Sequence, residues 1–306
     1  MLDRKRIGIY LAFAFGIAWA VALVVYLTGG IVNSPEIVPG TGITLALALI
    51  AGVYMMAPLL ANLFTRIVTR EGFRDAWLRP HFKKNWRFWA AGWIMPAVLT
   101  ILGAMLFFLL FPQYYDSELK TLASILKASG QQTVLNPWMI IIIQTLQAVL
   151  ISPLINGIAT FGEEFGWRAY LQPKLMLLGA RKAMLLMGVI WGVWHWPVIA
   201  MGHNYGVDYP GAPWLGMLMM VLFCFLCGTL LGWIAWRSGS VWPAVIGHAA
   251  INGIANLPSL FIQGKPSTLV GPLPVGIIPL VIWAIPVVYL MFNPRLFNRP
   301  AEEKAV

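Results

Sequence analysis

Residues 138–162 read WMIIIIQTLQAVLISPLINGIATFG, a stretch that contains no Asp, Glu, Lys or Arg. About 20 apolar residues in a helix are enough to cross the ~30 Å hydrocarbon core of a bilayer. This stretch is longer than that, so we expect it to span a membrane as a helix. Similar apolar runs fill most of the chain, which indicates a protein built from transmembrane helices.

The composition of the whole chain agrees with this interpretation. Hydrophobic residues make up 59% of the 306 residues, charged residues make up only 10%, and the mean hydropathy is +0.77. In a water-soluble domain, about a quarter of the residues are charged. We therefore expect an all-α fold, a polytopic integral membrane protein in which residues 1–306 form a single membrane domain.

The apolar runs predict about eight transmembrane helices. Their approximate ranges are Ile7–Leu27, Ile43–Phe64, Phe88–Phe111, Trp138–Gly162, Ala183–Met201, Trp214–Trp236, Val241–Leu257 and Val270–Phe292. After the fourth run, the stretch Gln172–Ala180 has Pro173 near its start and Gly179 near its end. We expect this stretch to form a short separate helix on the cytoplasmic side.

The basic residues predict the orientation. If the N-terminus lies in the cytoplasm, only Lys120, Lys127 and Lys265 of the 21 Lys and Arg residues fall on the opposite side. Lys and Arg accumulate in the short cytoplasmic loops of membrane proteins. Both termini are therefore expected in the cytoplasm, which requires an even number of spans. The same distribution explains the net charge of +10 without nucleic acid as a partner.

Polar side chains inside the expected spans indicate a functional site. Glu163 and Glu164 lie at the cytoplasmic end of the fourth span, His195 in the fifth, and His248 in the seventh with Asn252 one turn later. Ionisable groups within a bilayer are costly and usually functional. At 1.5 Å per residue, His195 lies about 18 Å and His248 about 10 Å from the cytoplasmic helix ends. If the three spans are neighbours, these side chains reach one cavity in the cytoplasmic half of the membrane.

The two glutamates have both structural and chemical interpretations. Glu164 precedes Arg168 by four residues, the favourable order for a helical ion pair, so this pair is either a clamp at a helix end or part of the site. Glu163 lacks such a partner in the sequence. A carboxylate in a desolvated cavity can act as a general base, and the alternative is a side chain that extends to water.

The histidines also have two interpretations each. His195 is either a buried packing residue or a participant in chemistry. His248 and Asn252 place two polar groups on one helix face, which suits binding of a developing oxyanion. The alternative for this pair is hydrogen bonding between helices.

Several classes of membrane protease are excluded. An aspartyl protease needs two aspartates in the bilayer, and no aspartate falls in an expected span. The HExxH motif of zincins is absent, and no serine stands in a convincing GxSxG elbow. The remaining set of Glu, His, His and Asn suits activation of water for attack on an amide bond, with or without a metal.

Three ordered motifs resemble a known family. Glu163–Arg168 reads EEFGWR and matches EExxxR; Trp191–His195 reads WGVWH and matches FxxxH with Trp for the usual Phe; His248–Asn252 reads HAAIN and matches HxxxN. In this order they are similar to the motifs of the CPBP intramembrane proteases. That family includes the CAAX prenyl endopeptidases and bacteriocin-processing or immunity-associated, Abi-like relatives. The motifs place a catalytic core at about residues 138–257.

The resemblance implies roles for these residues. Glu163 and His195 would position and activate the attacking water, and His248 and Asn252 would stabilise the oxyanion. The supporting residues would be Glu164, Arg168 and Trp191. The requirement for a divalent metal such as zinc is left open, and Glu163, His195 and His248 are the ligands it would take. We expect that no metal is obligatory.

The leading functional hypothesis is an intramembrane endopeptidase that cleaves a membrane-associated peptide or protein, with prenylation of that substrate left open. One alternative is a non-catalytic membrane adaptor, chaperone or immunity protein on the same scaffold. Another is a proton-coupled transporter that uses the intramembrane carboxylate and histidines as a relay. A transporter predicts a polar pathway through both halves of the bilayer, whereas these polar residues gather in one half.

Overall fold

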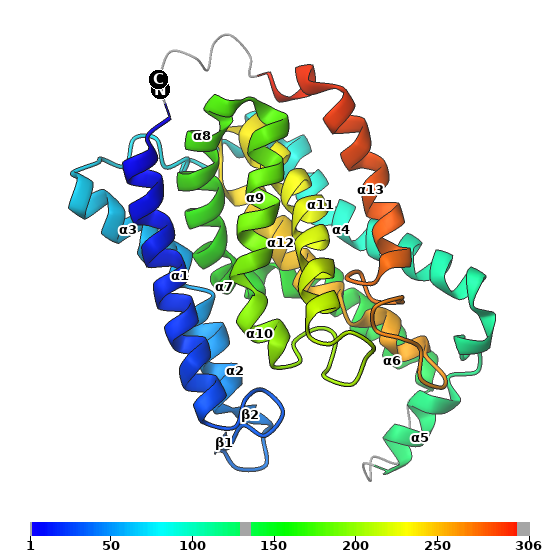
Figure 1. Ribbon diagram of the computed structural model, residues 1–306. Coiled ribbons are helices and arrows are strands. Elements are labelled where there is room, and N and C mark those ends of the chain that lie inside the picture. The colour runs from blue at the N-terminus through cyan, green and yellow to red at the C-terminus, as the bar shows by residue number, and fades with distance from the viewer. Residues whose placement is uncertain (1, 129–135, 299–306) are drawn as a thin grey trace.

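The computed structural model describes residues 2–128 and 136–298, and these form an almost entirely helical bundle (Figure 1). The helices are α1 Arg4–Leu27, α2 Leu45–Leu49, α3 Ala57–Thr69, α4 Phe82–Leu110, α5 Lys120–Ala128, α6 Pro137–Leu146, α7 Ser152–Gly166, α8 Gln172–Leu175, α9 Ala180–Trp194, α10 Trp196–Ala200, α11 Trp214–Ser238, α12 Trp242–Ile254 and α13 Ile277–Phe292. Two short strands, β1 Glu36–Val38 and β2 Ile43–Thr44, pair antiparallel in a hairpin. The expected all-α polytopic membrane fold is confirmed.

Within the described residues, six helical segments are long and apolar enough to cross a membrane. They are Arg4–Leu27, Leu45–Thr69, Phe82–Leu110, Pro137–Leu178, Trp214–Ser238 and Trp242–Phe261. These segments coincide with the first, second, third, fourth, sixth and seventh expected spans. The total of eight crossings and the placement of both termini in the cytoplasm stay predictions. α1 begins and α13 ends at the same end of the bundle, as an even number of crossings requires (Figure 1).

The fifth and eighth expected spans form shorter helices than the hydropathy suggests. The fifth is interrupted at His195, where α9 ends and α10 begins. Pro197 lies in the first turn of α10, where the missing amide proton of proline costs no hydrogen bond. The eighth span becomes helical only at Ile277. The preceding residues 271–276 read GPLPVG, and glycine with proline favours turns over helix.

The fourth span continues much further than expected. α6, α7 and α8, with the π-helical turns between them, run without a break as Pro137–Leu178. The helix expected at Gln172–Ala180 is present as α8 and the 3₁₀ turn Met176–Leu178, but it continues the fourth span and is not separate from it. Gln172 is completely buried, and its Nε2 donates a hydrogen bond to the carbonyl oxygen of Gly232 in α11 at 2.8 Å. This contact with a neighbouring helix holds the extension in the bundle.

Small residues bring the site helices close to their neighbours. A Cβ atom at Gly162 of α7 would lie 2.7 Å from the carbonyl oxygen of Met55, just before α3. A Cβ atom at Gly192 of α9 would lie 2.5 Å from the Cα atom of Val221 in α11. Any side chain at these positions would push the helices apart, so glycine permits the tight packing that is typical of membrane bundles.

Candidate active site

The two adjacent glutamates lie in the last turn of α7, where the backbone changes into the π-helical turn Trp167–Leu171. The exposed fraction is 3% for Glu163 and 0% for Glu164. Adjacent residues on a helix point in different directions, so the two carboxylates meet different partners. π-helical turns inside α-helices occur frequently at functional sites.

Glu164 joins two helices through its two carboxylate oxygens. Oε1 lies 2.9 Å from Nδ1 of His248 in α12, and Oε2 lies 3.2 Å from Nε of Arg168. The ion pair expected from the four-residue spacing is therefore present, and all three side chains are buried. The contact with His248 spans 84 residues of sequence and was not predicted. With Nδ1 engaged, Nε2 is the His248 nitrogen left for another partner.

Glu163 has a different partner. Its Oε2 accepts a hydrogen bond of 2.7 Å from the indole Nε1 of Trp191, a residue of α9 that lies 28 positions later in the chain. The sequence offers no signal for this contact, because it depends on how α7 and α9 are rotated against each other. Within the described residues, no other side chain donates a hydrogen bond to the Glu163 carboxylate.

His195 lies at the junction of α9 and α10, one turn after Trp191. Its Nδ1 lies 2.8 Å from the Trp191 carbonyl oxygen. A carbonyl oxygen only accepts hydrogen bonds, so Nδ1 must carry the proton and donate. The neutral imidazole then has an unprotonated Nε2, which is the nitrogen able to accept a proton.

The Trp191 ring lies at the centre of the cluster, with Arg168, His195 and His248 packed around it. The guanidinium carbon of Arg168 lies 4.6 Å from the centroid of the Trp191 ring. The His248 ring packs edge-on against it at 5.2 Å, and the His195 ring lies at 5.7 Å. Residues of α7, α9 and α12 are thereby brought together, as the expected common site requires.

Asn252 lies one helical turn after His248 in α12 but is exposed, whereas His248 is 6% exposed. In the described part of the chain, the Asn252 side chain makes no hydrogen bond. It is therefore near the cluster in sequence and helix position without being tied into it. Its assignment to the oxyanion site stays a prediction.

The residues expected as zinc ligands do not fit a metal in this arrangement. Among residues 2–128 and 136–298, no group of three or more His, Cys, Asp or Glu side chains is placed to hold a metal ion. We therefore derive the chemistry of the site from the side chains alone.

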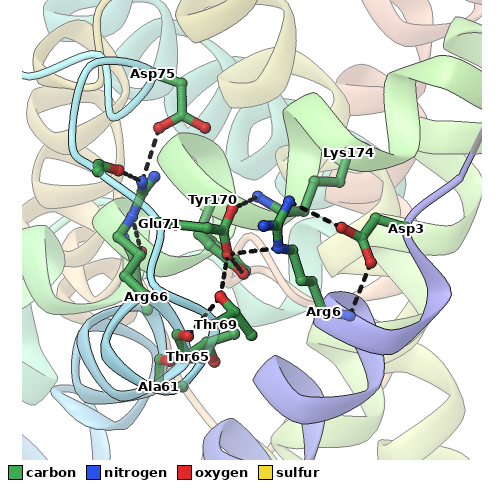
Figure 2. Close-up of polar contacts among 12 residues, drawn as sticks. Asp3, Arg6, Ala61, Thr65, Arg66, Thr69, Glu71, Asp75, Tyr170 and Lys174 are labelled. Atoms are coloured by element: carbon green, nitrogen blue, oxygen red, sulfur yellow. Dashed lines mark hydrogen bonds and ion pairs between the residues drawn. The ribbon is translucent and has the colours of Figure 1, made fainter.

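A second glutamate cluster lies at the end of the same long helix and was not predicted (Figure 2). Glu71, just after α3, accepts hydrogen bonds of 2.7 Å from Thr69 and Tyr170 on Oε1 and of 3.1 Å from Lys174 on Oε2. Arg6 of α1 lies 3.4 Å from Oε1. Partial burial raises the pKa of Glu71, but the hydrogen bonds from Tyr170, Thr69 and Lys174 outweigh it, so the pKa lies below its ordinary value.

Comparison with known proteins identifies the segment that carries the first cluster. Residues 138–254 match the family model of Rce1-like type II CAAX prenyl endopeptidases. This segment, called the Rce1-like domain below, therefore matches the CPBP family that the three motifs resemble. The Rce1-like domain contains α6 to α12 and includes Glu163, His195, His248 and Asn252. The resemblance seen in the three motifs is thus confirmed.

A curated relative of the Rce1-like domain is CAAX prenyl protease 2 of Methanococcus maripaludis. It is 34% identical to this chain over 100 residues, which cover 31% of this chain and 35% of the relative. The similarity therefore spans about a third of the length of that relative.

Proposed function

We propose that this protein is an intramembrane endopeptidase that hydrolyses a peptide bond in a membrane-associated substrate. One observation carries the proposal. Glu163, His195 and His248, from three separate helices, surround one tryptophan ring in the buried interior of the Rce1-like domain. A structural ion pair accounts for Glu164 and Arg168, but it leaves Glu163 and His195 unexplained.

The geometry supports a water-activation mechanism. Glu163 takes a proton from water, and the Nε2 atom of His195 orients that water by accepting its second proton in a hydrogen bond. The resulting hydroxide attacks the carbonyl carbon of the substrate. The proton held by Glu163 then passes to the leaving amine nitrogen as the carbon–nitrogen bond breaks.

The oxyanion formed in this attack needs hydrogen-bond donors at the site. Glu164 engages Nδ1 of His248, so Nε2 faces the reacting group and donates to the oxyanion when the ring carries a proton on both nitrogens; Asn252 supplies a side-chain amide from the same helix face. Glu164 in turn is held by Arg168. These two residues act by positioning His248 rather than by contact with the substrate.

We further propose that the substrate is a peptide anchored in the bilayer by a lipid, with prenyl groups as the first candidates. The predicted orientation places Glu163 and His248 in the cytoplasmic half of the membrane, where such an anchored peptide is accessible. The name of the relative, CAAX prenyl protease 2, supports a prenylated substrate. The same peptide without its lipid should be cleaved much more slowly, because the anchor concentrates it at the membrane.

Cleavage assays with purified protein in detergent test the proposal. Farnesylated, otherwise membrane-tethered and untethered peptides are incubated with wild type, Glu163→Ala and His248→Ala, and the products are identified by mass spectrometry. The matched control is Glu118→Ala, since Glu118 is exposed and pairs only with Lys120 among the described residues. Removal of the general base should lower kcat by roughly 10²–10⁴-fold, while the control should match wild type.

Three other results would direct the assignment elsewhere. Equal cleavage by wild type and Glu163→Ala would contradict the placement of the active site. Absence of cleavage of every peptide by wild type would favour the non-catalytic adaptor. Accumulation of a solute in sealed vesicles that depends on a proton gradient would favour the transporter.

A further inference from the structure

Trp191 makes one hydrogen bond to each of the two residues proposed to activate water, Glu163 and His195. Its indole Nε1 donates to Oε2 of Glu163 at 2.7 Å, and its backbone carbonyl accepts from Nδ1 of His195 at 2.8 Å. In the motif that this segment resembles, the position is usually Phe. A Phe backbone preserves the second contact, but a Phe side chain has no N–H group to make the first.

We propose that Trp191 is a positioning residue that orients Glu163 and His195 towards the same water molecule. This inference rests on the proposed endopeptidase function and adds to it a role that the usual Phe does not supply. Trp191 acts through Glu163 and His195 and need not touch the substrate itself.

The direction of the indole N–H is fixed by packing around the ring. Trp191 is 2% exposed, Arg168 lies over its ring at 4.6 Å, and the His248 ring meets it edge-on at 5.2 Å. Gly228 of α11 also lies beside the ring, where a Cβ would be in ordinary van der Waals contact with a Trp191 ring carbon at 3.5 Å. A ring held among these groups keeps its N–H aimed at Glu163 without a further loss of side-chain entropy.

The two hydrogen bonds define which atoms remain for chemistry. The indole occupies Oε2 of Glu163, so Oε1 is the oxygen left to take a proton from water. The Trp191 carbonyl occupies Nδ1 of His195, so Nε2 is the nitrogen left to face the same water. A hydrogen bond between a neutral donor and a carboxylate also favours the ionised carboxylate, which is the form a general base requires.

Trp191→Phe tests this role, because it keeps an aromatic ring for Arg168 and His248 and removes the N–H donor together with part of the ring volume. Trp233→Phe is the matched control. Trp233 donates to the Leu296 carbonyl oxygen at 3.1 Å, and Arg237 donates to the same oxygen at 2.7 Å, so this carbonyl keeps a partner in the variant. Both variants lose one indole N–H, but only the first loses a contact with the proposed site.

We expect Trp191→Phe to lower kcat by about tenfold or more with little change in KM, as for loss of a hydrogen bond to a charged group. The acid limb of its pH–rate profile should move to higher pH, since the ionised carboxylate loses a stabilising donor. Trp233→Phe should keep the wild-type profile. A purely structural role for Trp191 would lower the amount of folded enzyme and leave the profile of the remainder unchanged.

A spectroscopic measurement tests the contact without any substrate. In protein labelled with ¹⁵N-tryptophan, the Trp191 indole resonance is assigned by its disappearance in Trp191→Phe. It should shift in Glu163→Ala, while the Trp233 resonance should not. The inference would be overturned if the Trp191 resonance did not shift in Glu163→Ala, or if the kinetics of Trp191→Phe matched those of wild type at every pH. If the resonance responds but wild type cleaves nothing, the hydrogen bond stands, whereas the endopeptidase function and the positioning role both fail.

Discussion

Glu163 lies within the long helix Pro137–Leu178, and Glu71 contacts residues near the end of that helix, but the two carboxylates are held in opposite ways. Glu71, at the end of the bundle, receives hydrogen bonds on both oxygens, and three of its donors come from Thr69, Tyr170 and Lys174 (Figure 2). Glu163, in the interior, receives a single hydrogen bond, from Trp191, in the described part of the chain. A fully engaged carboxylate ties segments together, whereas one with a free oxygen can still exchange a proton.

Glu164 stands between these two cases. It is as deeply buried as Glu163, yet like Glu71 it has both oxygens engaged, one by His248 and one by Arg168. The comparison therefore shows that the depth at which a carboxylate is buried does not determine its role. Burial alone does not make a carboxylate reactive; the number of donors that already hold its oxygens decides how much of it remains available.

The largest effect that sharpens this comparison is expected for Glu164→Gln. It leaves the buried Arg168 guanidinium without its counter-charge, and removing one partner of a buried pair typically costs roughly 3–5 kcal/mol of stability. Thermal unfolding in detergent should show the loss, beside Glu118→Gln as an exposed control. Cleavage should fall as well, because His248 exchanges a charged carboxylate acceptor for a neutral amide oxygen. If Glu164→Gln were as stable as Glu118→Gln, the buried Glu164–Arg168 pair would contribute no more to stability than the exposed Glu118–Lys120 pair, which would contradict this prediction.

A smaller and pH-dependent effect is expected for Glu71→Gln. The pKa of Glu71 in the folded protein lies below its ordinary value of 4.5, so its carboxylate stabilises the fold at neutral pH. That contribution is present above the pKa of the unfolded chain and is lost as the pH falls through the lower folded-state pKa. The difference in melting temperature between wild type and Glu71→Gln should therefore be largest near neutral pH and shrink as the pH falls through the lowered folded-state pKa.

The same variant tests the separation of the two clusters. Per folded molecule, Glu71→Gln should cleave peptides at close to the wild-type rate, because Glu71 does not contact Glu163, His195 or His248. A pH-independent difference in melting temperature would contradict the role assigned to the ionised carboxylate. A large loss of kcat at unchanged stability would mean that the end of the long helix controls the interior site.

The smallest effect is expected from removal of divalent metals. Cleavage should persist after treatment with a chelator and dialysis into metal-free buffer, since no group of three or more His, Cys, Asp or Glu side chains among the described residues is placed to hold a metal ion. Loss of activity on chelation with recovery on addition of zinc would contradict this expectation. Measuring Trp191→Phe in parallel would then show whether the indole holds Glu163 as a metal ligand instead of as a base.

Much of the fold could be predicted because it depends on properties that run along the chain. The apolar run at residues 138–162 predicted a helix, and the structure has one there. Its end near Gly179 was also predicted. Its continuation through Gln172 was not, because Pro173 suggested the start of a separate helix, and burial of Gln172 against α11 overrides that local signal. The break at His195 was likewise hidden by continuous hydropathy on both sides.

The candidate site was likewise predictable only in part. The sequence singled out Glu163, Glu164, His195 and His248, because ionisable groups are costly in hydrocarbon and therefore stand out in apolar runs. The Glu164–Arg168 pair followed from helical spacing. The partners of Glu163 and His248 did not, since they lie 28 and 84 residues away on other helices.

The sequence by itself therefore determined that this is a multi-pass membrane protein and which polar residues lie within its helices, because membrane thickness and the cost of desolvating charge act on each segment separately. Tertiary structure alone decided which glutamate meets the tryptophan and which meets the histidine. That choice depends on how α7, α9 and α12 are rotated and how closely they approach. Contacts such as Gly162 against Met55 and Gly192 against Val221 set those rotations, and packing between helices is not encoded in the pattern of any one helix.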